Sequence, residues 1–146
     1  DPDVVTVKVG NKVDVEGDYV EQFALSMLTS PKVTVTDPGT TLPFSPSVVT
    51  AAAVTDGGAS AEPLEGMLCE VDTVTVANMN PDTPKDFDEF QITDSSAANL
   101  RVDDYVFDPL DNTYAVGTAF SKVVGICGFS FNQRKLWPRS LADLAP

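Results

Sequence analysis

Two segments, Glu62-Pro-Leu-Glu-Gly-Met-Leu-Cys-Glu-Val71 and Lys135-Leu-Trp-Pro-Arg-Ser-Leu-Ala-Asp143, bound the part of the chain that decides its fold. Between them, short runs of apolar and β-branched residues alternate with turn-forming residues, which is typical of an all-β domain. Strands are predicted at 66–77, 88–94, 98–103, 118–129 and 131–137. This order of long, short, short, long and medium strands is what a small closed Greek-key barrel needs. We therefore predict an all-β, five-stranded barrel at about residues 62–143.

Glycines and aromatic residues fit this barrel. Gly66, Gly125 and Gly128 lie inside or beside long strands, where a barrel needs bends or bulges to turn its corners. A single helical turn is predicted at Ser140–Leu144, after Pro138. Six phenylalanines are predicted to supply core volume, namely Phe87, Phe90, Phe107, Phe120, Phe129 and Phe131.

The N-terminal part also predicts β-structure. Apolar and polar residues alternate on both sides of Gly10-Asn11, which indicates two strands joined by a tight turn there. Further strands are predicted at 23–28 and 32–36. Pro, Ser, Thr, Ala and Gly dominate residues 40–61 and predict an extended connector, in which Val48–Val54 fits a short helix or a strand equally well. The predicted organisation is thus a β unit at 1–39, a connector at 40–61 and a barrel at 62–146.

The charge of the chain is strongly negative and unevenly distributed. The formal net charge is −13, and the residues before Lys122 carry 21 of the 22 acidic side chains but only 5 of the 9 basic ones. Nucleic-acid affinity depends on Lys and Arg that neutralise phosphates, so binding of DNA or RNA by this chain alone is not expected.

The composition argues against an enzyme. The chain has no histidine, which removes the commonest general base and the commonest transition-metal ligand. No apolar run is long enough for a transmembrane helix and no basic region precedes an apolar stretch, so we expect neither a transmembrane helix nor a signal peptide in this sequence. Because the sequence starts at Asp1 without a methionine, we expect a processed, secreted protein. Because it lacks histidine, we expect no catalytic residues and no requirement for a cofactor.

Two cysteines and two groups of carboxylates are candidate sites. Cys69 and Cys127 fall on strands that neighbour each other in the predicted barrel, which leaves both a disulfide and two buried free thiols open. Calcium needs six to eight oxygen ligands, but the carboxylate spacings match no EF-hand loop, and Asp beside Pro is also a common turn former. The candidate calcium ligands are Asp86, Asp88, Glu89, Asp103, Asp104, Asp108 and Asp111.

The last predicted strand combines cations with an aromatic residue. Its candidate contact residues for nucleic acid or a protein partner are Arg134, Lys135, Trp137 and Arg139. Such a set could stack a base and hold a phosphate. It is also typical of a barrel strand whose Leu136 points inward while long cations cover the exposed face, and this structural interpretation is the one we favour. The basic end could also meet an acidic surface on a neighbouring copy, and such head-to-tail contact produces filaments when its rotation does not close.

The motifs resemble a known family. The segment Val9–Gly17 with Glu21, the Glu-Gly-Met of residues 65–67, Leu100-Arg-Val-Asp-Asp104 and the Pro-Arg-Ser of residues 138–140 are similar, in order, to the OB-fold domains that accompany secreted bacterial nucleases. The resemblance implies an OB-like barrel at 62–143, tandem OB-like units and a catalytic domain elsewhere. Residues 1–36 look like the last strands of a first unit that lacks its front strands.

Two functions follow as expectations. The first is a secreted, non-catalytic structural or interaction module that assembles with itself through the N-terminal β segment, because unpaired strand edges are templates for pairing. The alternative is the accessory nucleic-acid-binding region of a larger secreted nuclease, as the resemblance implies. No membrane partner is expected.

Overall fold

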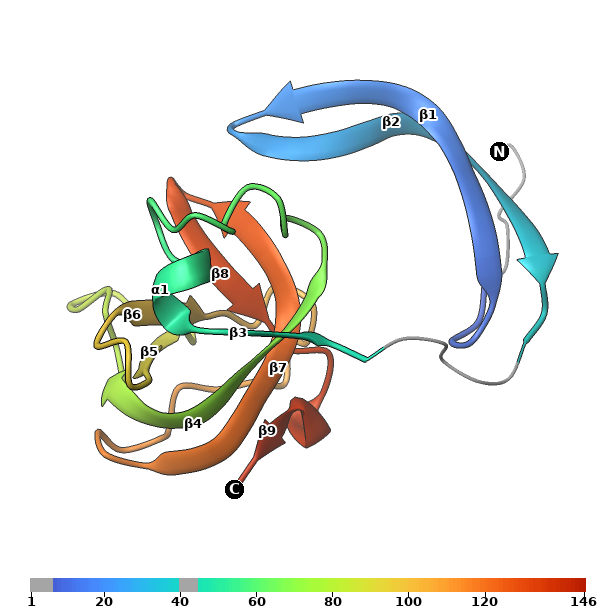
Figure 1. The fold of residues 1–146 in the computed structure, drawn as a ribbon. Helices are drawn as coiled ribbons and strands as arrows, with labels where there is room; N and C mark the ends of the chain where they lie inside the picture. The colour runs from blue at the N-terminus through green and yellow to red at the C-terminus, as the bar shows by residue number, and fades with distance from the viewer. Residues whose placement is uncertain (1–6, 40–44) are drawn as a thin grey trace. The chain divides into compact units, whose positions relative to one another are not determined.

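The computed structural model describes residues 7–39 and 45–146 of the chain. The chain divides into two compact units, with the boundary between Ser45 and Pro46. The first unit contains a two-stranded antiparallel sheet, formed by β1 (Lys12–Gln22) and β2 (Leu25–Asp37) (Figure 1). The second unit contains all the remaining strands in one seven-stranded sheet.

The hairpin turn lies at Phe23-Ala24, and its position corrects the prediction of a hairpin around Gly10-Asn11. Phe23 and Ala24 both have positive φ angles, 53° and 60°, as a two-residue turn between twisted strands requires. A turn does exist at Gly10-Asn11, where the backbone N–H of Lys8 donates to the Asn11 side chain at 2.7 Å, but it joins no paired strands. The predicted strand at 4–9 is absent from residues 7–9, and residues 4–6 lie outside the described residues.

The second unit is the predicted closed barrel. Its strands are β4 (Leu68–Asn78), β5 (Phe90–Thr93), β6 (Asn99–Val102), β7 (Ala119–Ser130) and β8 (Gln133–Trp137). They are hydrogen-bonded in the order β4-β5-β6-β8-β7, and pairing of β4 with β7 closes the ring. Among these five strands, β6 and β8 are the one pair that runs parallel. The five-stranded, OB-like barrel predicted from the sequence is confirmed.

Short elements complete the sheet: the helical turn predicted at Ser140–Leu144 is present, and the segment Val48–Val54, predicted as a helix or a strand, contains part of one strand and one short helix. β3 (Ser47–Val49) pairs in parallel with β4, and α1 (Ala51–Val54) follows at once. Both lie in the segment predicted as an extended connector. They are ordered because Ala51 and Val54 are buried in the barrel core. At the other end, the 3-10 turn η1 (Leu141–Asp143) leads into β9 (Leu144–Ala145), which pairs with β7.

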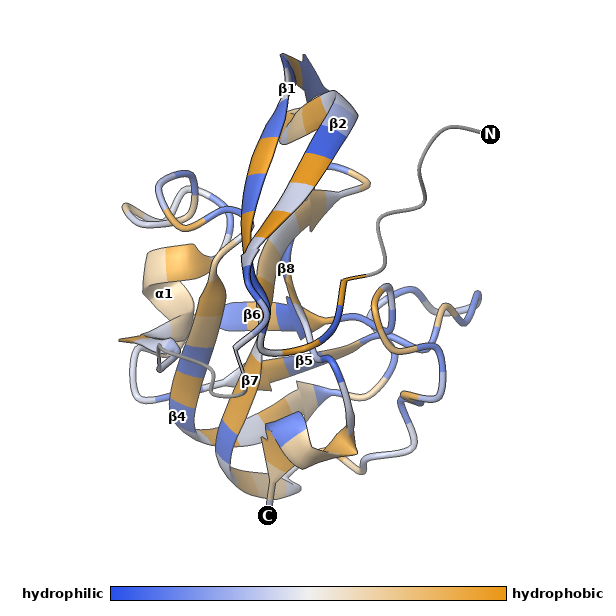
Figure 2. Cartoon of the chain, turned by 90° about the vertical axis from the view of Figure 1, so that its right-hand side faces the viewer, coloured by the Kyte–Doolittle hydropathy of each residue, from blue (hydrophilic) through white to orange (hydrophobic). Residues whose placement is uncertain are grey.

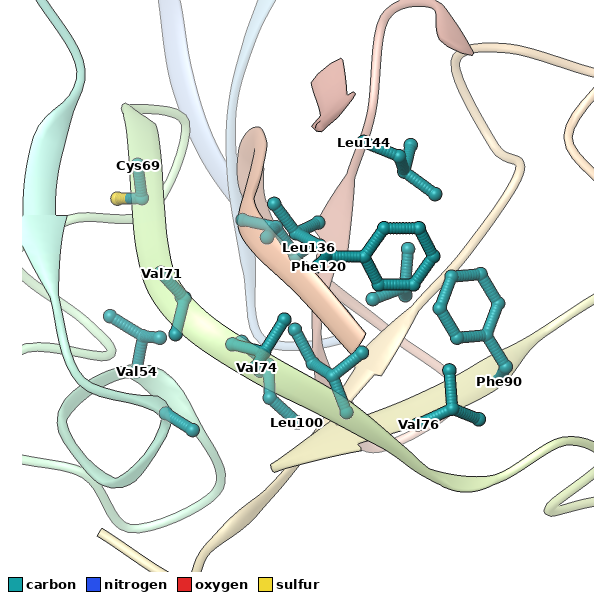
Figure 3. Close-up of a cluster of buried hydrophobic side chains, with 14 of the residues drawn as sticks. Val54, Cys69, Val71, Val74, Val76, Phe90, Leu100, Phe120, Leu136 and Leu144 are labelled. Atoms are coloured by element: carbon teal, nitrogen blue, oxygen red, sulfur yellow. The ribbon is translucent and has the colours of Figure 1, made fainter. Parts of the chain in front are cut away.

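The core lies inside the barrel (Figure 3). Inward side chains of β4, among them Cys69, Val71 and Val76, meet Leu100 of β6 and Leu136 of β8. Burial alternates with period two at Cys69 and Val71 and again at Val74 and Val76, and the alternation shifts by one residue at Thr73, which has a positive φ of 52°.

The phenylalanine prediction is correct for only part of the set. Phe90 and Phe120 are buried in the core, and Phe107 packs against it. Phe87 and Phe131, in contrast, are 55% and 93% exposed, which shows that the core prediction was wrong for these two.

Two of the predicted glycines are required by close packing. A Cβ atom at Gly128 would lie 2.2 Å from the indole ring of Trp137, and one at Gly125 would lie 2.8 Å from Leu136. Both distances are too short for any side chain. β8 can therefore pack closely against β7 only because Gly125 and Gly128 have no side chain.

Candidate interaction sites

One face of the β1–β2 hairpin is apolar. Cross-strand pairs place Val13 beside Val35, Val15 beside Val33, and Tyr19 beside Leu28 on the same side of the sheet. Tyr19 is 66% exposed, and Val15 and Leu28 are each 46% exposed. Figure 2 shows this alternation as orange and blue bands along both strands. No residue in 7–39 is buried.

The opposite face of β1 is acidic. Asp14, Glu16 and Asp18 follow one another at every second position and are all exposed. The cross-strand neighbour of Glu16 is Lys32, whereas Asp14 and Asp18 lie beside threonines. Within residues 7–39 and 45–146, none of these three carboxylates forms an ion pair.

Each predicted contact cation at the end of the barrel has a carboxylate partner. Arg134 of β8 bonds to Glu62 and Glu65, which ties the first bounding segment of the barrel to β8. The Arg139 guanidinium donates to Asp143 through Nε at 2.9 Å and a terminal nitrogen at 2.8 Å. The sequence contained both partners of Arg134, but their separation of about seventy residues gave no signal of pairing.

Trp137 is not available for stacking a base. Its side chain lies against Gly128, the residue is 7% exposed, and Tyr105 covers it with a ring separation of 4.7 Å. The indole N–H is buried and has no hydrogen-bond partner within the described part of the chain. The structure therefore places this residue within the packing of β7 and β8.

A chain of buried ion pairs joins the two predicted groups of carboxylates. Lys135 bonds to Glu89 and lies 2.8 Å from Asp103, and the Lys135 residue is only 3% exposed. Glu89 also accepts a bond of 2.8 Å from Arg101, which reaches Asp82 at 2.6 Å. Sequence reasoning missed Arg101, whose position on the outer side of β6 beside Lys135 brings it into this network.

Asp104 lies close to three other candidate carboxylates, Asp88, Asp103 and Asp108. Burial, a hydrogen bond with Asp103 and the negative charges of Asp103, Asp88 and Asp108 together raise the pKa of Asp104 to about 6. Asp86 accepts a bond from Asn112 at 2.6 Å, and Asp111 is exposed. Within residues 7–39 and 45–146 no group of three or more acidic or cysteine side chains is arranged to hold a metal ion, so geometry adds no support to the calcium prediction.

Cys69 and Cys127 are free thiols, both buried, which corrects the disulfide alternative. The cross-strand partner of Cys69 is Gly125, so Cys127 is its diagonal neighbour. Diagonal neighbours lie about 7–8 Å apart in an antiparallel pair, beyond the usual Cα separation of bridged cysteines. Hydrogen bonding with Cys69, together with burial, raises the pKa of the Cys127 thiol.

The fold assigns this chain to a structural class, the OB-like barrels, and not to a named family. Comparisons with protein-family models, curated proteins and solved structures found no match. No helix within residues 7–39 and 45–146 is long and apolar enough to cross a membrane. The chain is an OB-like barrel with a β-hairpin unit whose faces are both exposed within that unit.

Proposed function

We propose that this chain is a non-catalytic, secreted interaction module that assembles with copies of itself through the β1–β2 hairpin. The supporting observation is that the hairpin unit buries no residue while it presents a continuous apolar face. An isolated two-stranded hairpin is marginally stable in water, so a second layer on this face would stabilise it.

The lack of charge on the apolar face favours a second copy of this chain as the partner that covers it. From Val13 to Tyr19 on β1, and at Leu28, Val33 and Val35 on β2, the apolar face carries no charged side chain. Two copies of a chain with net charge −13 can meet there without opposing like charges. The free edge of β2 is rich in neutral threonine and adds backbone donors and acceptors to the same contact.

The nuclease-accessory role that the resemblance implies is less well supported. It would need free cations beside an accessible aromatic ring. In this barrel Arg134, Lys135 and Arg139 are all paired with carboxylates, and Trp137 is covered by Tyr105. A titration with single-stranded DNA at low salt would show binding only if these pairs open.

Sedimentation velocity over a range of concentrations tests self-assembly. We expect the unmodified chain to form oligomers, and the triple variant Val15→Thr, Tyr19→Thr, Leu28→Thr to associate at least about a hundredfold more weakly, because large apolar side chains contribute about 1.5–3 kcal/mol each when buried. Threonine keeps a high strand propensity, so the hairpin itself should persist.

The matched control replaces three exposed apolar side chains of the barrel unit, Val48, Met67 and Leu141, by threonine. This control should assemble like the unmodified chain. A monodisperse monomer at all concentrations, or equal loss in both triple variants, would contradict the proposal. Negative-stain imaging of the oligomers distinguishes filaments from closed rings.

A further inference from the structure

The β1–β2 hairpin is built in the same way as the β7–β8 hairpin of the barrel. Each turn consists of two residues with positive φ, Phe23-Ala24 in one and Phe131-Asn132 in the other. Five consecutive cross-strand pairs then match, from Gln22–Leu25 to Asp18–Thr29 in one hairpin and from Ser130–Gln133 to Ile126–Trp137 in the other.

A glycine follows at the corresponding position of each hairpin. A Cβ atom at Gly17 would lie 2.8 Å from the carbonyl oxygen of Thr29, and one at Gly125 would lie 2.9 Å from the carbonyl oxygen of Trp137. Thr29 and Trp137 are themselves corresponding residues. Both hairpins bend along their length in Figure 1. The bend at Gly125 lets β7 turn a barrel corner, and Gly17 allows the same bend in β1.

This correspondence shows what a strand on the free edge of β1 would meet. The equivalent edge of β7 is occupied by β4, which runs antiparallel. On the face towards the barrel interior, Cys69 of β4 lies beside Gly125, and Val71 of β4 lies beside Val123. Outward, charges are complementary, because Asp72 lies beside Lys122 and the Lys122 ammonium is 3.0 Å from Glu70.

Val15 and Gly17 of β1 correspond to the residues of β7 that face the barrel interior. Asp14, Glu16 and Asp18 correspond to those that face outward. We propose that the free edge of β1 binds an antiparallel strand of another protein in which apolar and basic side chains alternate. The apolar side chains of the bound strand extend the apolar face of the hairpin. Its basic side chains pair with the acidic row formed by Asp14, Glu16 and Asp18. Backbone hydrogen bonds provide affinity, and the alternation provides specificity.

The β1 strand of a second copy does not fit that edge. Antiparallel pairing of two β1 strands would place Asp and Glu of one copy beside Asp and Glu of the other, which is destabilising. The acidic row thus keeps the β1 edge from pairing with itself while the neutral β2 edge and the apolar face stay available. This inference is independent of the proposed self-assembly.

Fluorescence anisotropy of labelled strand peptides tests the β1 edge, using the full chain at concentrations where sedimentation shows a monomer. The probe is a ten-residue peptide of alternating Val and Lys, compared with alternating Val and Glu and with a block-ordered peptide of the Val/Lys composition. Only the alternating Val/Lys peptide should bind. The variant Asp14→Asn, Glu16→Gln, Asp18→Asn should bind it roughly tenfold more weakly.

The control Asp72→Asn, Asp108→Asn, Asp111→Asn removes the same charge from exposed residues of the barrel unit and should leave binding unchanged. Hydrogen exchange should show new protection in β1 rather than in β2. The inference is overturned if the block-ordered peptide binds equally well, if the barrel control loses as much affinity, if protection falls on β2, or if no peptide binds.

Discussion

Asp104 is the residue whose surroundings most directly make the stability of the fold depend on pH. Its carboxyl group is half-buried beside Asp103 and close to the charges of Asp88 and Asp108. Burial and these charges favour the neutral form, so the pKa of Asp104 rises to about 6 from its ordinary value of 3.8. The folded state therefore holds this proton more tightly than the unfolded state.

Substitution Asp104→Asn tests this shift. A pKa raised on folding adds stability below pH 3.8, and that contribution is lost as the pH rises through about 6. We expect the variant to melt roughly a few degrees above the unmodified chain at pH 7.5, with the difference shrinking towards pH 4. Thermal melts at several pH values measure this, with Asp111→Asn as the exposed control. A constant difference across pH would contradict the assignment.

Lys135 shows how packing changes the role of a surface residue. Its position on β8 predicts a cation that covers an exposed barrel face, yet the residue is 3% exposed and bonded to Glu89 and Asp103. Those carboxylates come from the segments flanking β5 and β6, which are brought together by the parallel pairing of β6 with β8. Removing one partner of such a buried pair leaves an uncompensated charge.

At the level of the elements, the two-residue turns are among the points of local backbone strain. Phe131 has a φ of 50° and is 93% exposed, so its side chain gains little from the fold apart from the Lys135 ammonium 5.5 Å from its ring. A left-handed backbone conformation costs roughly 1–2 kcal/mol for most residues but less for Asn. The turn geometry is required by strand twist and not by this side chain.

Replacing Phe131 by Asn should therefore raise the free energy of unfolding by about 0.5–1 kcal/mol. The β-branched control Phe131→Val should lower it, since valine is poorly tolerated at positive φ. Urea denaturation followed by Trp137 fluorescence measures both. Equal stability of the two variants would show that the turn is not strained.

At the scale of the whole molecule, the core belongs entirely to one unit. Every residue of the buried cluster lies between Ala51 and Leu144, and no residue of 7–39 contributes to it. The barrel closes through β4 and β7 without any strand from the first unit. The energetic basis of the fold is thus contained in residues 46–146.

The fragment 46–146 should fold by itself. We expect a cooperative thermal transition within roughly a few degrees of that of the full chain, because its buried apolar surface is unchanged. A peptide of residues 7–39 should show no cooperative transition, as is usual for a single hairpin. Circular dichroism measures both, and a fragment 46–146 without a transition would show that the hairpin unit stabilises the barrel.

Local pattern was sufficient for much of the fold. Alternating apolar residues and turn formers located the five barrel strands because burial alternates with period two within β5 and β6 and within each half of β4. The turn at Phe23-Ala24 was missed because neither residue is a usual turn former, whereas Gly10-Asn11 carries the usual signal without paired strands around it. Phe131 was assigned to the core because hydrophobicity alone does not distinguish a strand position from a turn position.

The sequence by itself determined the all-β class, the barrel between its two bounding segments, the acidic balance and the lack of histidine, since each depends on composition or on residues close together in the chain. Only the tertiary structure decided the ion pairs of Arg134 and Lys135, the free state of Cys69 and Cys127, and the correspondence of the β1–β2 and β7–β8 hairpins. These depend on strand register and on which distant segments meet. Register is a property of pairing between strands, which no single strand's sequence contains.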